Sequence, residues 1–483
     1  MHEVSLLIGG KDAPASNGAT FDRVNPATGE VASRAAAATP VDADQAVAAA
    51  QAAFPEWAAL APNERRRRLL KAADLMEQRA GDFIRAGSAE TGGTQGWYGF
   101  NVMLACRMLQ EAAAMTTQIT GEVIPSDLPG NFAMAVRQPC GVVLGIAPWN
   151  APVILGARAV AMPLACGNTV VLKASELCPA VHRLIGSVLQ EAGLGDGVIN
   201  VILNAPADAP PIVERLIANP AVKRINFTRS TAVGRIVAQL AARHLKPALL
   251  ELGGKAPFVV LDDADLDAAV DAAAFGAFFN QGQICMSTER IVVDAAVADD
   301  FVEKLARKAA SLKSGNGEND GSLLGSLVSS DAVKRVQGLI QDAVAKGAYI
   351  AAGGGADGSA MQPTVVDHVT RQMKLYSKES FGPVAAVVRV NGEEEAVRVA
   401  NDTEYGLSAA VFGRDPARAL NVARRIESGI CHINGPTVHD EALMPFGGVK
   451  SSGYGRFGGR AAIAEFTDLR WITMQTEPRH YPI

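Results

Sequence analysis

Cysteine is scarce in this sequence of 483 residues, and its cysteines follow no pattern. The six of them show no CxxC pair and no spacing with histidine that suits a metal, which argues against a disulfide framework and a structural zinc site. No stretch of about twenty apolar residues is present to span a membrane. The N-terminus also lacks the charged and then apolar segments of a signal peptide. We therefore expect a cytoplasmic protein with no bound metal and no membrane partner.

An excess of positive charge is also missing. Lysine and arginine total 45 against 50 aspartates and glutamates, a formal net charge of −5, so no basic field exists to hold a nucleic acid. The dense cationic run at residues 65–68 lies among leucines and alanines at helical spacing and is predicted to be a solvated helix face. What the chain does have is 48% hydrophobic residues and a length that predicts roughly three structural units.

The chain divides into two parts with different sequence patterns. Apolar residues at helical spacing predict helices over 42–87 and 95–117, and alternation around two prolines predicts strands over 119–140. From Gly141 strands and helices alternate, which predicts an α/β protein with parallel sheets covered on both faces. The buried-strand runs are 142–146, 169–173, 198–202 and 224–228, and a second alternating unit starts at 256. A strand-like tail after Trp471 is a candidate to extend the sheet of a neighbouring subunit.

One cysteine, Cys285, lies on a glycine-containing turn just beyond a predicted helix at 265–279. A thiol presented in this way is a strong nucleophile once it is deprotonated. The alternative is that Cys285 packs as a small buried hydrophobe, as we expect for the other five cysteines.

The ends of the first group of strands carry residues suited to a dinucleotide. Lys173 ends one strand, and Glu176 follows it with a carboxylate that can accept from ribose hydroxyls and repel a 2′-phosphate. Ser230 follows another strand and opens a helix, whose N-terminus is a seat for phosphate. The GxGxxG motif is absent, so an ordinary strand–helix turn with an ordinary cap remains the alternative.

Two further residues suit carbonyl chemistry. Glu251 ends an apolar strand before two glycines, and burial would raise its pKa toward that of a general base; the alternative is a strand-end carboxylate paired with Lys255. Asn150 lies in a stiff turn between prolines, where its amide can donate to an oxyanion; the alternative is that it merely caps the next helix.

Together these pieces resemble the aldehyde dehydrogenase superfamily over essentially the whole chain. The matching motifs are Pro148-Trp149-Asn150, Lys173-Ala174-Ser175-Glu176, Phe227-Thr228 with Ser230 and Gly234, Glu251-Leu252-Gly253-Gly254-Lys255, Gly282-Gln283-Ile284-Cys285, Glu379-Ser380-Phe381-Gly382-Pro383-Val384 and Pro445-Phe446-Gly447-Gly448. The resemblance implies the aldehyde dehydrogenase fold, with three parts. These are a Rossmann-like NAD-binding domain (1–120, 141–250 and 445–469), an α/β catalytic domain (251–444) and a β oligomerisation arm (121–140 and 470–483).

The resemblance also assigns roles. Cys285 is the nucleophile, Asn150 holds the oxyanion, and Glu251 activates the water that hydrolyses the thioester. NAD is the implied cofactor. Its implied contacts are Ile146, Ala147, Pro148, Trp149, Lys173, Ser175, Glu176, Phe227, Thr228, Ser230, Gly234, Leu252, Glu379 and Phe381.

Two positions depart from the family pattern. Arg229 stands where glycine is usual, beside the phosphate-binding Ser230. Its cation would contact the cofactor phosphates or crowd the adenine pocket, and it would relax the preference against NADP. Ala174 replaces a common proline, and we expect little effect from it.

The segments around Asn150 and Cys285 resemble the branch that oxidises salicylaldehyde, vanillin and benzaldehyde. Arg158, about two turns along the helix after Asn150, is expected either to reach a polar substituent of the substrate or to form a buried pair with an acid. Apolar candidates for the ring are Trp97, Tyr98, Ile284, Met286, Leu443 and Phe446.

The sequence therefore predicts an NAD-dependent aromatic aldehyde dehydrogenase of homodimeric or homotetrameric form, with salicylaldehyde-like substrates first and vanillin or benzaldehyde second. Within the fold, the alternative is a CoA-acylating enzyme, a type that tends to lack the glutamate base, so Glu251 speaks against it. The alternatives outside this chemistry are a thiol hydrolase that needs no cofactor and a binding protein that retains the fold.

Overall fold

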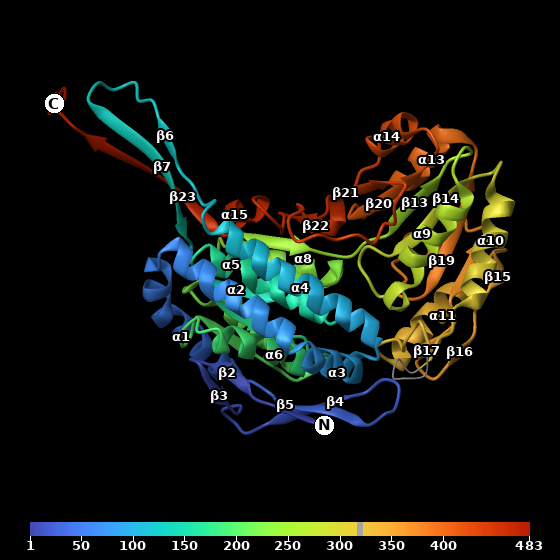
Figure 1. The fold of residues 1–483 in the computed structure, drawn as a ribbon, viewed down its shortest axis with the longest axis horizontal. Helices are drawn as coiled ribbons and strands as arrows, with labels where there is room; N and C mark the ends of the chain where they lie inside the picture. The colour runs from blue at the N-terminus through green and yellow to red at the C-terminus, as the bar shows by residue number, and fades with distance from the viewer. Residues whose placement is uncertain (316–321) are drawn as a thin grey trace.

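The computed structural model describes residues 1–315 and 322–483, and its core is built on two large sheets (Figure 1). The first has eight strands in the order β22-β12-β11-β8-β9-β10-β2-β3. Strands β8 to β12 run parallel, and every residue of β8, β9 and β10 is buried, as expected when helices cover both faces. The strands are β2 (Leu6–Ile8), β3 (Lys11–Ala13), β8 (Val142–Ile146), β9 (Thr169–Lys173), β10 (Ile199–Ile202), β11 (Val222–Thr228), β12 (Ala248–Glu251) and β22 (Gly453–Tyr454).

Helices cover this sheet in two groups. Helices α5 and α6 pack against each other and against β8 to β10, whereas α1, α7 and α8 form a second chain of contacts along the sheet. Helices α2 to α4 lie over the α5–α6 layer. The helices are α1 (Pro40–Ala59), α2 (Pro62–Gln78), α3 (Ala80–Thr91), α4 (Gln95–Met115), α5 (Pro152–Ala165), α6 (Pro179–Glu191), α7 (Ala209–Ala218) and α8 (Thr231–Arg243).

The second sheet has seven strands in the order β15-β18-β19-β14-β13-β20-β21. All its pairings are parallel except that of β15 with β18. Its strands are β13 (Ala256–Val260), β14 (Thr288–Asp294), β15 (Tyr349–Ala352), β18 (Thr364–Asp367), β19 (Val384–Val390), β20 (Ser408–Phe412) and β21 (Ile430–Ile433). The helices of this part are α9 (Leu266–Phe278), α10 (Ala298–Ser311), α11 (Ser330–Ala345), α12 (Lys374–Ser377), α13 (Gly392–Asn401) and α14 (Pro416–Ala423). The predicted α/β class is confirmed.

A third sheet projects from the body as a long arm that carries the C-terminus at its tip (Figure 1). Its strands are β6 (Glu122–Ile124), β7 (Asn131–Pro139) and β23 (Thr467–Gln475). Strand β23 pairs antiparallel with β7 of the same chain along its whole length, and it begins before the tail that the sequence singled out. The arm exposes large apolar side chains, among them Val123 (69%) and Trp471 (75%).

One prediction about the surface is wrong in part. Arg65 is buried, and its guanidinium donates to the carbonyl oxygens of Leu60 and Ala165, because this face of α2 packs inward. The remaining arginines of the run are at least partly exposed. Among the helices of the described chain, none is both long enough and apolar enough to cross a membrane.

Candidate active site

The cysteine turn leaves the end of α9 in a tight, left-handed path. Asp265 caps the start of this helix, and the short 3-10 turn η2 (Phe279–Gly282) follows its end. Asn280 and Gln281 adopt φ angles of 47° and 55°, which most side chains avoid. Cys285 comes next and is only partly buried, so its thiol is presented to a cavity as predicted.

Asn150 is fixed against this turn. Its carbonyl oxygen accepts hydrogen bonds from Asn280 Nδ2 at 3.0 Å and from Trp97 Nε1 at 3.2 Å. Helix α5 starts at Pro152 with Ala151 as its N-cap, so the alternative that Asn150 merely caps the helix is wrong. The Asn150 side chain is left to line the same cavities as the Cys285 thiol.

Three cavities adjoin one another in this part of the molecule. The central cavity, of about 200 Å³, is lined by Asn150, Glu251, Cys285, Glu379 and Phe381 among others. The aromatic cavity, of about 400 Å³, shares Asn150 and Cys285 with it. The sheet-end cavity, of about 590 Å³, lies beyond β9 and β11 and shares Arg229 and Ser230 with the central cavity. Cys285 therefore faces two spaces from one position.

Glu251 reaches the central cavity from the end of β12. Neither carboxyl oxygen has a hydrogen-bond partner among residues 1–315 and 322–483, although both are buried. Burial raises the pKa of Glu251 to about 8, against the smaller opposing effects of the Arg158 charge and the Cys285 thiol. The alternative pairing with Lys255 is wrong, because Lys255 Nζ lies 2.6 Å from Glu289.

The surroundings of Cys285 also favour the protonated form of its thiol. Burial, followed by the charges of Glu251 and Glu379, raises its pKa well above the ordinary value, and the Arg158 charge opposes this shift. Forming the thiolate therefore requires a nearby group that takes the proton. Glu251 is the adjacent candidate.

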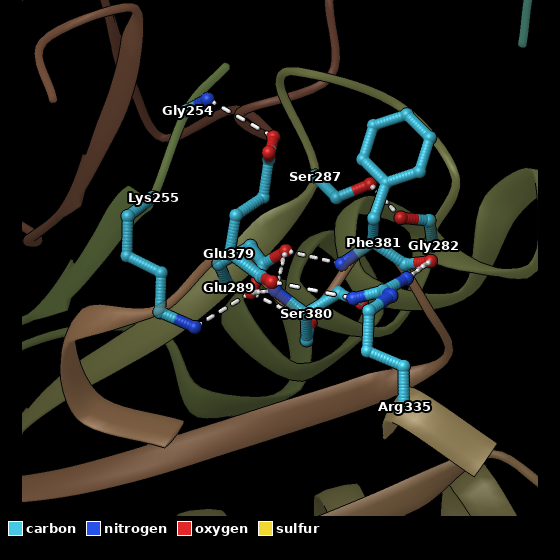
Figure 2. A network of polar contacts seen from close by, with 9 residues as sticks. All are labelled: Gly254, Lys255, Gly282, Ser287, Glu289, Arg335, Glu379, Ser380 and Phe381. Atoms are coloured by element: carbon cyan, nitrogen blue, oxygen red, sulfur yellow. Dashed lines mark hydrogen bonds and ion pairs between the residues drawn. The ribbon is translucent and has the colours of Figure 1, made fainter. Parts of the chain in front are cut away.

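A buried network behind the central cavity was not predicted from the sequence (Figure 2). Glu289 on β14 accepts from Lys255 Nζ, from Ser380 N and Oγ at 2.9 and 2.6 Å, and from Phe381 N at 2.9 Å. Arg335 donates to the Ser380 carbonyl oxygen at 2.6 Å. These bonds fix the 379–381 segment so that Phe381 meets Trp149 edge to face at 5.7 Å.

Glu379 directly precedes Ser380 in the same segment. Its Oε1 accepts from Gly254 N at 3.1 Å, and burial raises its pKa to about 7. The sequence gives one indication of this network: Lys255 ends one of the matched motifs, and Glu289 lies four residues after another. Their pairing joins two strands of the second sheet and depends on the fold.

The sheet-end cavity brings the predicted ribose-binding residues together. Glu176 lies between two cations: Lys173 Nζ is 3.5 Å from one oxygen, and Arg229 Nη2 is 2.5 Å from the other. Burial alone would raise the pKa of Glu176, but the charges of Lys173 and Arg229 outweigh it and lower the pKa to about 2. Glu176 is therefore an anion under all ordinary conditions.

The residues present fit a dinucleotide. Ser230 is the N-cap of α8, yet its hydroxyl makes no cap bond to the described chain, and Ser230 borders both the sheet-end and central cavities. Free N–H groups at a helix N-terminus suit a phosphate. Ile146, Phe227 and Lys173 line the sheet-end cavity, and Pro148, Trp149, Thr228 and Leu252 line the central one. Ala147, Ser175 and Gly234 are not among the lining residues.

The aromatic cavity is lined mainly by apolar side chains, together with a smaller number of polar ones. Its predicted walls Trp97, Ile284, Met286 and Phe446 all line it, and Phe279 meets the Trp97 ring edge to face at 5.0 Å. Two candidates are wrong. Tyr98 is buried with its hydroxyl on Thr91, and Leu443 is 54% exposed at the surface.

Arg158 forms the buried pair with an acid that was one of its two predicted alternatives. Its Nη2 lies 2.5 Å from Asp440, a buried pair, and its guanidinium stacks 4.2 Å from the centre of the Phe446 ring. Both members of the pair also line the aromatic cavity. Arg158 is thus held in place in the lining of that cavity.

Comparison with known proteins defines the class. The pattern of the aldehyde dehydrogenase family matches residues 13–472, so the chain belongs to this family and has its fold. It is an enzyme of the aldehyde dehydrogenase class, which uses NAD or NADP.

Individual relatives cover the whole length. The chain is 71% identical to a vanillin dehydrogenase of Pseudomonas sp. (strain HR199 / DSM 7063), over 100% of both proteins. It is 50% identical to a salicylaldehyde dehydrogenase of Pseudomonas sp. (strain C18), over 99% of this chain and 100% of the relative. Its structure superposes with a TM-score of 0.98 on a salicylaldehyde dehydrogenase from Pseudomonas putida G7 complexed with salicylaldehyde, at 49% identity and full coverage of both chains.

Proposed function

We propose that this enzyme oxidises an aromatic aldehyde to its carboxylic acid with NAD as the oxidant. The observation that carries the proposal is the position of Cys285 at the junction of two cavities. One is walled by aromatic rings and suits the aldehyde. The other leads to the sheet end, where a dinucleotide fits.

The residues divide the reaction between them. Cys285 loses its proton to Glu251, and its sulfur adds to the aldehyde carbon to form a thiohemiacetal oxyanion. The side-chain amide of Asn150 donates to that oxygen without protonating it, so the negative charge that expels hydride is retained. Bound NAD supplies the hydride acceptor.

Hydride loss leaves a thioester on Cys285. Glu251, once deprotonated, takes a proton from water as the water attacks the thioester carbon. Collapse of that intermediate releases the acid and restores the Cys285 thiolate. The carboxyl of Glu251, which has no hydrogen-bond partner in the part of the chain that the structure describes, is free to hold a water in this step.

Vanillin-like aldehydes are the first candidates for the substrate and salicylaldehyde the second, because the 71% identical relative is a vanillin dehydrogenase and the 50% identical one is a salicylaldehyde dehydrogenase. This reverses the order expected from the sequence. Trp97, Met286 and Phe446, which line the aromatic cavity, enclose the ring, and Arg158 of the same lining meets a phenolic oxygen.

The cofactor and the assembly follow from other parts of the chain. Glu176 accepts from the ribose hydroxyls of NAD. The arm of β6, β7 and β23, with exposed Trp471, packs against further copies of the chain in a homodimer or homotetramer. Six free cysteines agree with a cytoplasmic location.

The test is a panel of kcat/KM values for vanillin, salicylaldehyde, benzaldehyde and an aliphatic aldehyde, each with NAD. The highest value is expected for a ring-hydroxylated benzaldehyde. A preference for the aliphatic aldehyde would refute the assignment of the aromatic cavity. If no aldehyde yields NADH, the thiol hydrolase alternative stands instead.

A further inference from the structure

Arg229 occupies an unusual place in the nucleotide site. It lies in the turn between β11 and α8, and its backbone N–H donates to the carbonyl oxygen of Glu251 at 3.2 Å. Its side chain turns the other way and pairs with Glu176. Arg229 also lines both the sheet-end and the central cavity, so the guanidinium borders the path that a bound dinucleotide takes.

The charge balance around Glu176 is the reverse of a site that rejects NADP. A lone carboxylate at the adenosine ribose accepts from the 2′-hydroxyl and repels a 2′-phosphate. Here that carboxylate is shared by Lys173 and Arg229, so the cluster carries a net positive charge. Across the whole lining of the sheet-end cavity, Lys173, Arg229 and Arg243 outnumber Glu176 and Glu214.

The three charged side chains of this cluster also differ in how exposed they are. The side chains of Lys173 and Glu176 are 1% and 10% exposed, whereas that of Arg229 is 29% exposed. Arg229 can therefore turn from Glu176 toward a ligand without disturbing the core. A guanidinium presents several donors in a plane, which matches the oxygens of a phosphate.

We propose that Arg229 gives the sheet-end cavity a seat for a ribose 2′-phosphate, so that the enzyme binds NADP as well as NAD. This inference deepens the proposed function, on which it rests for the use of a nicotinamide dinucleotide. Glu176 accepts from the ribose hydroxyls when NAD is bound. When NADP is bound, Arg229 and Lys173 together donate to the added phosphate.

The test measures binding by calorimetry to the full-length enzyme without aldehyde, using two fragments. 2′,5′-ADP carries the 2′-phosphate, and 5′-AMP lacks it. The wild-type protein is expected to bind both. Arg229→Ala should weaken 2′,5′-ADP by about tenfold to a hundredfold, the range for hydrogen bonds to a charged group, and should leave 5′-AMP unchanged.

Two variants serve as controls. Arg235→Ala removes an equal charge one turn into α8, where Arg235 pairs with Glu404 outside the three cavities, and should change neither affinity. Arg229→Lys keeps a cation and should retain part of the preference for 2′,5′-ADP. The affinity of NADP itself should follow that of 2′,5′-ADP across the series.

Three results would overturn the inference. They are a wild-type enzyme that does not bind 2′,5′-ADP, an Arg229→Ala protein that binds it as the wild type does, and equal weakening of both fragments. The last would place Arg229 at the 5′-phosphate. None of these measurements needs an aldehyde, so a failure of the aldehyde panel and a failure of this inference are separate outcomes.

Discussion

Replacement of Glu251 by glutamine separates the two halves of the proposed reaction. The first turnover still yields one NADH per site, at a rate below that of the wild type, because water takes the thiol proton in place of Glu251. The thioester is then hydrolysed slowly, because no carboxylate activates the attacking water. Loss of a general base lowers the steady-state rate by about 10² to 10⁴. Rapid mixing should show a burst of NADH followed by slow turnover.

The pH dependence gives this prediction a second measure. With a pKa of about 8, Glu251 is about one tenth ionised at pH 7 and about nine tenths ionised at pH 9. If hydrolysis of the thioester limits turnover, the wild-type rate should rise about tenfold between these values and then level. E251Q should lose this rise.

Stability should change in the opposite sense. A rise in pKa from 4.5 to about 8 makes the buried carboxylate about 5 kcal/mol less stable than it is in the unfolded chain. That cost is absent below pH 4.5, grows up to about pH 8 and is complete above it. The wild type therefore loses stability over this pH range and E251Q does not, so the free energy of unfolding of E251Q should rise relative to that of the wild type. Urea titrations at several pH values measure the difference.

A matched control is Glu90→Gln. Glu90 is also buried, with a pKa raised by burial to about 7, but it lies outside the three cavities and accepts from Ser33 and from the start of α6. It should show no burst. Steady turnover of E251Q at the wild-type rate, or a stability difference that does not vary with pH, would refute the reasoning.

Three further predictions concern separate parts of the molecule. Cys285→Ala should abolish aldehyde oxidation while calorimetry still shows NAD binding, and turnover near the wild-type rate would exclude Cys285 as the nucleophile. Asn150→Ala should lower kcat by about 10² to 10³ with a smaller change in KM, the usual loss for one oxyanion donor; a change in KM alone would assign Asn150 to binding. Trp471→Asp should shift the oligomer toward monomer in light scattering, and an unchanged mass would remove Trp471 from the interface.

The sequence predicts the framework because that information is local. Buried parallel strands are continuous apolar runs, and those at 142–146 and 169–173 match β8 and β9 residue for residue. A lone cysteine carries no comparable signal. Only the set of motifs, in their order along the chain, distinguishes Cys285 from the other five cysteines.

Pairings between distant residues could not be predicted. Arg158 and Asp440 are separated by 282 positions, and the sequence around either residue does not indicate its partner. The pairing of Lys255 with Glu289 likewise depends on the register of β13 beside β14. Composition offers many carboxylates for each cation, and the choice among them is made by the tertiary structure.

Several exceptions to local rules occur near Cys285. Asn280 and Gln281, just before Cys285, and Phe381 across the central cavity all adopt left-handed φ angles, at 47°, 55° and 43°. Glu251 beside them is buried without a hydrogen-bond partner in the described chain. Each of these features costs free energy, and such costs are concentrated at functional sites. Their proximity to the Cys285 thiol agrees with the proposal that the protein retains this strain to hold a nucleophile, a base and a cofactor-binding segment in register.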